Sequence, residues 1–192
     1  MLKKPSKVPQ PSSKVPERYT ISRFVRDVFE VVVPAIILFL IIRAFFLESR
    51  FVPSPSMVPT IQVQDRFLLN KTAYWFKSPG RYQVVIFKPP AQAGVKEDFV
   101  KRIIGLPGET IKVHNGVVYI NGQPLAEPYI TPDRAPIREF NSYIIPDGHL
   151  FVMGDNRNNS QDSRYWGPLP IKNIKGEAWW RFWPLNRVGI VK

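Results

Sequence analysis

The segment that decides the fold is Ile111–Ile120, with the sequence IKVHNGVVYI. Two short, mainly aliphatic runs flank Asn115-Gly116, a dipeptide that favours the type I′ turn of a tight β-hairpin. His114 lies beside this turn and is accounted for by it. The segment therefore predicts a hairpin and indicates a β fold.

Further short strands are expected on both sides of the hairpin. Runs of aliphatic and aromatic residues bounded by turn formers occur at Arg66–Lys71, Tyr82–Lys88, Asp98–Ile104, His149–Met153 and Gly176–Phe182. The proline-rich stretch Asn121–Pro146 has little periodicity and is expected to leave the sheet as an extended excursion. We therefore predict that residues 48–192 form one mainly β domain, an antiparallel, barrel-like sheet.

Composition limits the chemistry that this domain can perform. With 192 residues and 44% hydrophobic content, the chain can bury one sizeable core. It contains no cysteine, which excludes disulfides, thiolate catalysis and cysteine-based metal sites. His114 and His149 are both expected in turns, so a histidine metal site or a Ser-His-Asp triad is poorly supplied. We expect neither a metal nor another cofactor.

The formal net charge of +12 would suit either a nucleic acid or an anionic membrane as partner. No nucleic-acid-binding motif is found in the chain. Basic residues are instead concentrated before the main apolar run, at Lys3, Lys4, Lys7, Lys14, Arg18, Arg23 and Arg26. This distribution favours a lipid bilayer as partner and argues against nucleic acid.

The one apolar run of membrane length covers residues 28–47 and is interrupted by Glu30, Pro34 and Arg43. Its uncharged centre is short, and that length also fits a buried helix or the core of a signal peptide. However, terminal charges can reach the membrane interface, membrane helices tolerate proline, and no small-residue cleavage site follows. We predict a single transmembrane helix preceded by a disordered basic tail over residues 1–19. The excess of basic residues before the helix predicts a cytoplasmic N-terminus and an extracytoplasmic β domain.

The segment Pro53–Thr60, with the sequence PSPSMVPT, follows the predicted anchor directly. Its prolines restrict the backbone at several consecutive positions and cannot continue an arriving helix, so a serine within it would be presented rigidly. Composition alone favours a linker between an anchor and a domain.

Lys101 is a candidate base for such a serine. Strand alternation over Asp98–Ile104 places Phe99, Lys101 and Ile103 on one face, so the lysine has apolar neighbours and no adjacent carboxylate. To act as a base near neutrality its pKa must fall by about 3, a change that burial alone can supply. A lone lysine of this kind could also simply reach solvent from an ordinary strand.

A second unusual stretch, Gly154–Gly167, is too polar for a core strand. Arg102, on the strand face opposite Lys101, would need an acidic partner if buried, and either Asp155 or Asp162 in this loop could supply it. Downstream, tryptophans cluster at Trp179, Trp180 and Trp183, where they could fill the core or meet a lipid interface.

Three of these stretches resemble the conserved boxes of bacterial type I signal peptidases, membrane-anchored proteases with a Ser/Lys dyad. They are Pro53–Thr60, the segment KRIIGLPG at 101–108, and the segment GDNRNNSQDSR at 154–164. They occur in the family's order, after an N-terminal anchor, and the resemblance extends from about Arg23 to Trp183. It outweighs the linker interpretation of the first stretch.

The resemblance implies a serine endopeptidase that cleaves the signal peptides of secreted preproteins at the outer face of the membrane. Ser56 would be the nucleophile and Lys101 its general base. The Ser54 hydroxyl and the Ser56 N–H would form the oxyanion hole, and Ser160 would orient the lysine. The supporting residues would be Arg102, Asp155, Arg157, Asp162 and Arg164.

The substrate implied is a preprotein cut after a small residue, with another small residue two positions earlier. An extended substrate would pair with a sheet edge. The membrane would be the cell membrane, with a thylakoid membrane as the alternative. The chain departs from the family at Tyr82-Gln83, where Gly-Asp is usual; we expect this position to affect local packing and not catalysis.

Two other functions use the same features differently. Self-cleaving SOS-response repressors also pair a Ser-Met with a lysine, but they lack the anchor and the polar loop. A basic, membrane-tethered binding module without catalysis is the alternative from a different functional class.

Overall fold

A computed structural model describes residues 20–191, apart from the side chains of residues 44 and 45. The chain divides into two units, Met1–Leu40 and Ile41–Lys192. The first described element is helix α1, Ile21–Phe45, which contains Pro34. The predicted tail over residues 1–19 lies outside the described residues.

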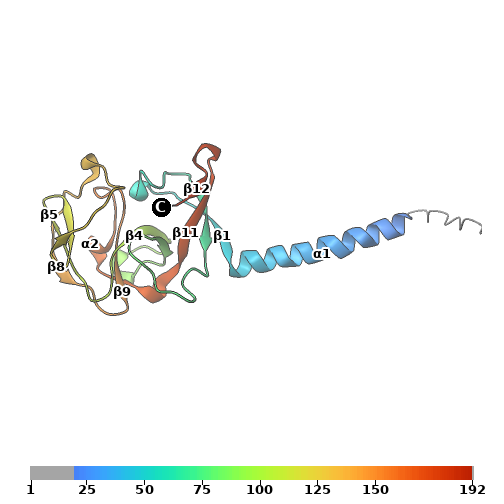
Figure 1. Cartoon of the computed structure of the whole chain (residues 1–192), viewed down its shortest axis with the longest axis horizontal. Coiled ribbons are helices and arrows are strands. Elements are labelled where there is room, and N and C mark those ends of the chain that lie inside the picture. Colours follow the sequence, from blue (N-terminus) through green and yellow to red (C-terminus); the bar gives the residue numbers. More distant parts are fainter. Residues whose placement is uncertain (1–19, 192) are drawn as a thin grey trace, which may run out of the picture. The chain divides into compact units, whose positions relative to one another are not determined.

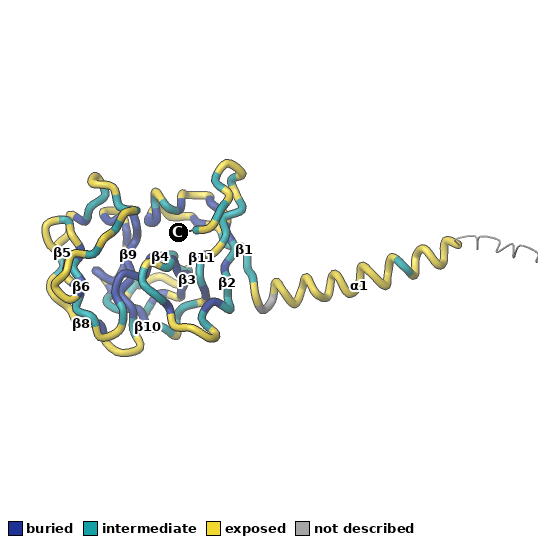
Figure 2. Tube along the Cα trace, in the orientation of Figure 1, coloured by how far each residue is buried: buried dark blue, intermediate teal, exposed yellow. Residues whose placement is uncertain are grey.

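Helix α1 exposes large apolar side chains along most of its length, as the yellow tube in Figure 2 shows. It begins before the predicted membrane segment of residues 28–47 and ends at Phe45, so Leu47 belongs to a strand. Within residues 20–191, none of the helices combines the length and the apolarity that crossing a membrane requires.

The second unit is mainly β, as predicted, and all of its strand pairs are antiparallel (Figure 1). An eight-stranded sheet follows the order β1-β2-β11-β3-β4-β9-β10, with β12 paired to β11. Its strands are β1 (Leu47–Phe51), β2 (Arg66–Asn70), β3 (Val84–Phe87), β4 (Phe99–Gly105), β9 (His149–Met153), β10 (Leu169–Pro170), β11 (Ile174–Trp183) and β12 (Gly189–Ile190). The order leaves β1 and β10 at the two ends of the path.

A four-stranded sheet of order β7-β6-β5-β8 holds the predicted hairpin. Its strands are β5 (Thr110–His114), β6 (Val117–Ile120), β7 (Gln123–Pro124) and β8 (Phe140–Ile144). Asn115 and Gly116 have φ values of 47° and 78°, so both central residues are left-handed, as a type I′ turn requires. The hairpin prediction is confirmed, and part of the proline-rich excursion returns to the sheet as β8.

Five predicted strands of the larger sheet are found as β2, β3, β4, β9 and β11, with ends shifted by a few residues. Strand β1 was not predicted because its sequence, LESRF, carries two charges. Those charges form ion pairs at the sheet edge, where Glu48 lies 2.8 Å from both Arg50 and Lys71. Short helical turns connect the strands: η1 (Pro55–Met57), η2 (Ala91–Ala93), η3 (Pro132–Arg134), α2 (Ser163–Trp166), η4 (Ile171–Asn173) and η5 (Leu185–Arg187).

The most deeply buried strands are β3, β4 and β9, which Figure 2 shows mainly in dark blue. Val84 and Ile86 pack with Met57, next to Ser56, whereas Val85 and Phe87 pack with Ile103 on the opposite side of β3. On β4, Val100 packs against the first of these groups and Ile103 belongs to the second, so both faces of β4 are covered as well. Polar side chains on this strand are withdrawn from water whichever way they point.

Candidate active site

Ser56 lies in the single turn η1, and its side chain is held at the surface of the core. Only 6% of the residue is exposed, and Met57 beside it is fully buried. Asn156, from the polar loop, fixes the backbone here: its N–H donates to the Ser56 carbonyl at 3.0 Å, and its Nδ2 donates to the Pro55 carbonyl at 3.2 Å. The serine is thus presented rigidly, as the prolines predicted.

Lys101 reaches Ser56 from strand β4. Its Nζ donates to Ser56 Oγ at 2.7 Å and to the Val100 carbonyl at 3.1 Å. The lysine is 3% exposed, pairs in register with Val85, and has its Nζ 5.0 Å from the centre of the Phe99 ring. The apolar face that alternation predicted is therefore present.

This environment weakens the basicity of the lysine. Burial lowers the pKa of Lys101 from 10.5 to about 8, because the ammonium loses its hydration. The carboxylates of Asp162 and Asp155 act against this fall, and the Arg164 guanidinium adds to it. A substantial fraction of the amine is therefore neutral at mildly alkaline pH and can accept a proton from the adjacent hydroxyl.

Ser54 and the Ser56 N–H, the two predicted oxyanion donors, lie next to each other. The Ser56 N–H donates to Ser54 Oγ at 3.2 Å, which makes Ser54 the N-cap of η1. Ser54 is otherwise exposed, so its hydroxyl hydrogen can turn toward a substrate.

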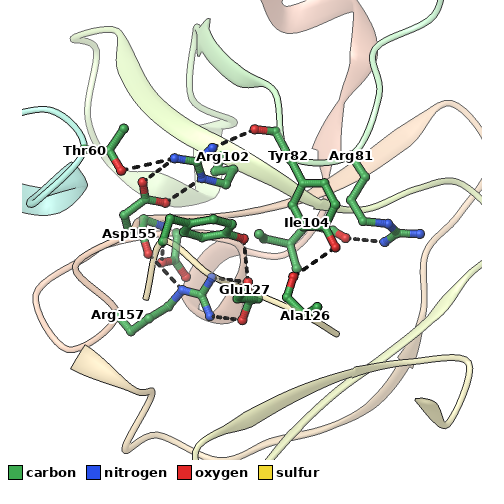
Figure 3. Close-up of polar contacts among 12 residues, drawn as sticks. Thr60, Arg81, Tyr82, Arg102, Ile104, Ala126, Glu127, Asp155 and Arg157 are labelled. Atoms are coloured by element: carbon green, nitrogen blue, oxygen red, sulfur yellow. Dashed lines mark hydrogen bonds and ion pairs between the residues drawn. The ribbon is translucent and has the colours of Figure 1, made fainter. Parts of the chain in front are cut away.

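Arg102 and Asp155 form a bidentate ion pair in which the side chains are 2% and 0% exposed (Figure 3). Arg102 Nε and Nη2 donate to the two Asp155 oxygens at 2.8 and 2.6 Å. Arg102 also donates to the Tyr82 carbonyl at 2.8 Å and to Thr60 Oγ1 at 3.2 Å. Of the two acids that the sequence offered, Asp155 is thus the partner, and it ties β4 to the polar loop.

Asp162, Arg164 and Arg157 organise the rest of that loop. Asp162 accepts two hydrogen bonds from the Arg164 guanidinium, each at 2.8 Å, and one from the Gly154 N–H at 3.1 Å. Arg164 also donates to the Arg157 carbonyl at 2.7 Å, and Arg157 Nε donates to the Gly154 carbonyl at 3.0 Å. All three side chains are buried, so the loop has an internal ionic core.

Ser160 is buried in the same loop, but the hydrogen bond to Lys101 that the resemblance implied is not present. Within the part of the chain that the structure describes, Ser160 Oγ has no hydrogen-bond partner. It packs instead against Gly154: a Cβ placed on that glycine would lie 2.3 Å from Ser160 Oγ and 2.4 Å from the Ser56 carbonyl oxygen.

Gly154→Ala is therefore expected to displace the loop from Ser56, because the methyl group cannot fit between two polar atoms, one of them on the backbone. We expect cleavage activity to fall by about 100-fold, which is the loss of rate that a displacement of a reacting group by about 1 Å typically causes. Steady-state cleavage of a preprotein measures it. Gly80→Ala is the control, because a Cβ on Gly80 would make only an ordinary contact, 3.6 Å from Gln83 Oε1. Retention of full activity by Gly154→Ala would contradict the packing seen around Gly154.

Several contributors to this site carry no clear sequence signal. Asn156 holds the Ser56 backbone. Glu127 and Tyr129 come from the proline-rich excursion, where Glu127 pairs with Arg157 and the Tyr129 ring packs on Arg102. Only Asn156 and Gly154 belong to a stretch that the sequence singled out. Among residues 20–191, no group of three or more histidine, aspartate or glutamate side chains could hold a metal ion.

The similarity to known proteins extends over most of the chain and is not confined to this site. The family model described as "Signal peptidase, peptidase S26" matches residues 25–183. The chain belongs to the signal peptidase family. A probable signal peptidase I-1 of Synechocystis sp. is 42% identical over 172 residues, which are 87% of this chain and 87% of that protein. A signal peptidase I of Leptolyngbya laminosa is 45% identical over 160 residues, 81% of this chain and 78% of the relative.

A probable thylakoidal processing peptidase 2 of Arabidopsis thaliana is 39% identical over 160 residues, 80% of this chain but 43% of that longer protein. Membership in the signal peptidase family makes this chain an enzyme that cleaves signal peptides. The alternatives of a binding module and of a self-cleaving repressor are set aside.

The departure from the usual signal peptidase pattern at Tyr82-Gln83 has a structural explanation. Tyr82 has a φ of 72°, a left-handed conformation that glycine adopts freely and a tyrosine adopts at a cost of about 1–2 kcal/mol. Its hydroxyl donates to the Ala126 carbonyl at 3.0 Å, and its ring packs edge-on against Tyr129. Gln83 Oε1 accepts from the Gly80 N–H at 2.6 Å, a role that an aspartate could also fill.

Proposed function

We propose that Ser56 is the nucleophile and Lys101 the general base of this signal peptidase. The observation that supports the proposal is the 2.7 Å hydrogen bond between Lys101 Nζ and Ser56 Oγ, made by side chains that are both nearly excluded from water. A neutral amine at that position accepts the hydroxyl proton as Oγ attacks the scissile carbonyl carbon.

The reaction then proceeds in two stages. The tetrahedral intermediate collapses to an ester on Ser56 as the C–N bond breaks, and the Lys101 ammonium returns its proton to the leaving amine. Lys101 then takes a proton from a water molecule as that water attacks the ester carbonyl. The second tetrahedral intermediate collapses to the carboxylic acid as the bond to Ser56 Oγ breaks, and the Lys101 ammonium returns its proton to Oγ. Lys101 thus acts as base and then as acid in each stage, and it ends neutral as it began.

The negative oxygen of each intermediate would be held by the Ser56 N–H and the Ser54 hydroxyl. In the unliganded site the Ser56 N–H donates to Ser54 Oγ, so the exposed Ser54 side chain must rotate away before both groups can donate to the substrate oxygen. Loss of one such donor typically costs about 100-fold or more in turnover.

The substrate proposed is an extended preprotein segment with a small residue before the cut. A cavity of about 300 Å³ is lined in part by Phe51, Pro53, Ile86 and Val100; Pro53 precedes Ser54 and Val100 precedes Lys101 in the sequence. Strand β1 ends the path of the larger sheet and pairs with β2 alone, so its outer edge can pair with an extended peptide.

Ser56→Ala is expected to reduce cleavage of a model preprotein to background, because no other hydroxyl contacts Lys101 Nζ within residues 20–191. The matched control is Ser142→Ala, an exposed serine in β8, which should cleave like wild type. A serine-acylating inhibitor should label wild type and Ser142→Ala at Ser56, and it should not label Ser56→Ala at this position. Cleavage by Ser56→Ala at the wild-type rate would refute the assigned nucleophile.

We further propose that the enzyme acts at a membrane, with its N-terminus in the cytoplasm and residues 48–192 outside. Support comes from the exposed apolar side chains of α1 and from the basic residues that precede it. Trp179 and Trp183, which are 43% and 48% exposed and therefore do not fill the core, supply amphipathic rings suited to a lipid interface. The bilayer is a cell membrane or a thylakoid membrane.

The absence of cysteine allows a direct test of this orientation. A membrane-impermeant maleimide should label Ser142→Cys in intact cells, whereas Ser12→Cys should be labelled only after permeabilisation. Equal labelling of both positions before permeabilisation, or recovery of the chain in the soluble fraction, would contradict the proposed location.

A further inference from the structure

Glu127 and Tyr129 lie in the proline-rich excursion, outside the three sequence boxes of the family resemblance. The Glu127 side chain is 10% exposed and forms a bidentate ion pair with Arg157, whose side chain is fully buried (Figure 3). Arg157 Nη1 donates to Glu127 Oε2 at 2.8 Å. Arg157 Nε donates to the Gly154 carbonyl, so the same guanidinium contacts both Glu127 and the polar loop. Glu127 supplies the negative charge that balances it.

Tyr129 connects this ion pair to the other one. Its hydroxyl donates to Glu127 Oε1 at 2.7 Å, and Arg102 Cζ lies 4.0 Å from the centre of its ring. Burial, followed by the charge of Glu127, raises the pKa of Tyr129, so the hydroxyl remains a donor at all working pH values. One aromatic side chain therefore contacts both the Arg102–Asp155 pair and the Arg157–Glu127 pair.

The two ion pairs meet on the segment that holds the proposed nucleophile. Gly154 and Asp155 are the residues bound by Arg157 and Arg102, and Asn156, next in sequence, donates to the Ser56 carbonyl. A shift of this segment would displace Ser56 relative to Lys101, which lies on a different strand. The path from Glu127 to the serine consists of contacts between buried or half-buried groups throughout.

We propose that Glu127 and Tyr129 are positioning residues of the peptidase: they fix the Gly154–Asn156 segment and, through it, the separation of Ser56 from Lys101. The proposal rests on the assignment of those two residues above. Neither Glu127 nor Tyr129 contacts Ser56, Lys101 or the small cavity in the described structure. Their loss should therefore slow the chemical step and leave substrate binding nearly unchanged.

The test compares kcat and KM for preprotein cleavage in paired variants. Glu127→Ala and Tyr129→Leu are expected to lower kcat by about 30- to 100-fold with KM changed less than about 3-fold. Tyr129→Phe keeps the ring on Arg102 and should retain kcat within about 5-fold, as should Glu127→Asp, which keeps a negative charge for Arg157. Recovery by these conservative variants separates positioning from bulk packing.

Leu169→Ala is the stability control, because Leu169 is fully buried in a core cluster that includes neither Glu127 nor Tyr129. It should lower the midpoint of thermal unfolding while kcat stays at the wild-type value. The inference is overturned if Tyr129→Leu folds and keeps the wild-type kcat. It is also overturned if Glu127→Ala or Tyr129→Leu raises KM and leaves kcat unchanged. Ser56→Ala in the same assay distinguishes the two failures: its full activity would refute the proposed function, whereas its inactivity beside an unimpaired Tyr129→Leu would refute only this inference.

Discussion

Lys101→Met is expected to abolish preprotein cleavage, lowering kcat/KM by at least about 1000-fold from about pH 6 to about pH 10, because it removes the base and acid of both stages. The methionine fills a similar volume, so the cavity left behind is small. Lys112→Met on the exposed face of β5 is the matched control and should retain full activity. Substantial cleavage by Lys101→Met would show that another group takes the proton.

The same variant is expected to be more stable than wild type at neutral pH. The fall in pKa from 10.5 to about 8 corresponds to about 3 kcal/mol, the cost of holding an ammonium in the core. Between these pH values the unfolded chain binds more protons than the native one, so wild-type stability rises with pH across this window. The penalty is therefore greatest below about pH 8, and Lys101→Met should gain most there and little above about pH 10.5. Denaturant unfolding at two pH values measures the difference.

Asp155→Ala is expected to destabilise the second unit by about 3–5 kcal/mol, because it leaves the Arg102 guanidinium buried without its main counter-ion. Cleavage should fall with it, since Asp155 belongs to the segment that fixes the Ser56 backbone. Chemical denaturation followed by tryptophan fluorescence measures the free energy of unfolding.

Two controls define what this destabilisation means. Asp133→Ala breaks an exposed contact of 3.7 Å with Arg134 and should leave the stability nearly unchanged. Replacing both buried partners, as Arg102→Met with Asp155→Leu, should recover much of the stability lost by Asp155→Ala because no unpaired charge remains. A loss by Asp155→Ala no larger than that of Asp133→Ala would contradict the buried ion pair.

Much of the fold follows from local sequence. The Asn115-Gly116 turn specifies its own hairpin, and alternation on β4 correctly placed Lys101 among apolar side chains. The sequence did not predict β1 because Glu48 and Arg50 make it polar. Glu48 gains its second partner, Lys71 directly after β2, only when the two strands pair. The choice of Asp155 over Asp162 for Arg102 also depended on tertiary structure, since Asp162 is occupied by Arg164 two residues away.

The support around the site was less predictable. Glu127 and Tyr129 lie in a stretch without periodicity, and what brings them to the arginines is the path of the whole excursion. The unusual Tyr82 could be recognised as a departure in sequence, but its left-handed backbone and its contact with Tyr129 are tertiary facts. For Ser160, the family resemblance implied a hydrogen bond that orients Lys101, but Ser160 Oγ makes no hydrogen bond within the described residues.

The most direct test of the Ser56–Lys101 mechanism is the pH dependence of kcat/KM for the wild-type enzyme on a model preprotein. Because the chain must bind substrate with Lys101 neutral, kcat/KM should rise with pH as a single titration whose midpoint lies at about 8. A midpoint at about 10.4, the ordinary value for lysine, or a profile with no rise between about pH 6 and about pH 10, would contradict a buried lysine as the base.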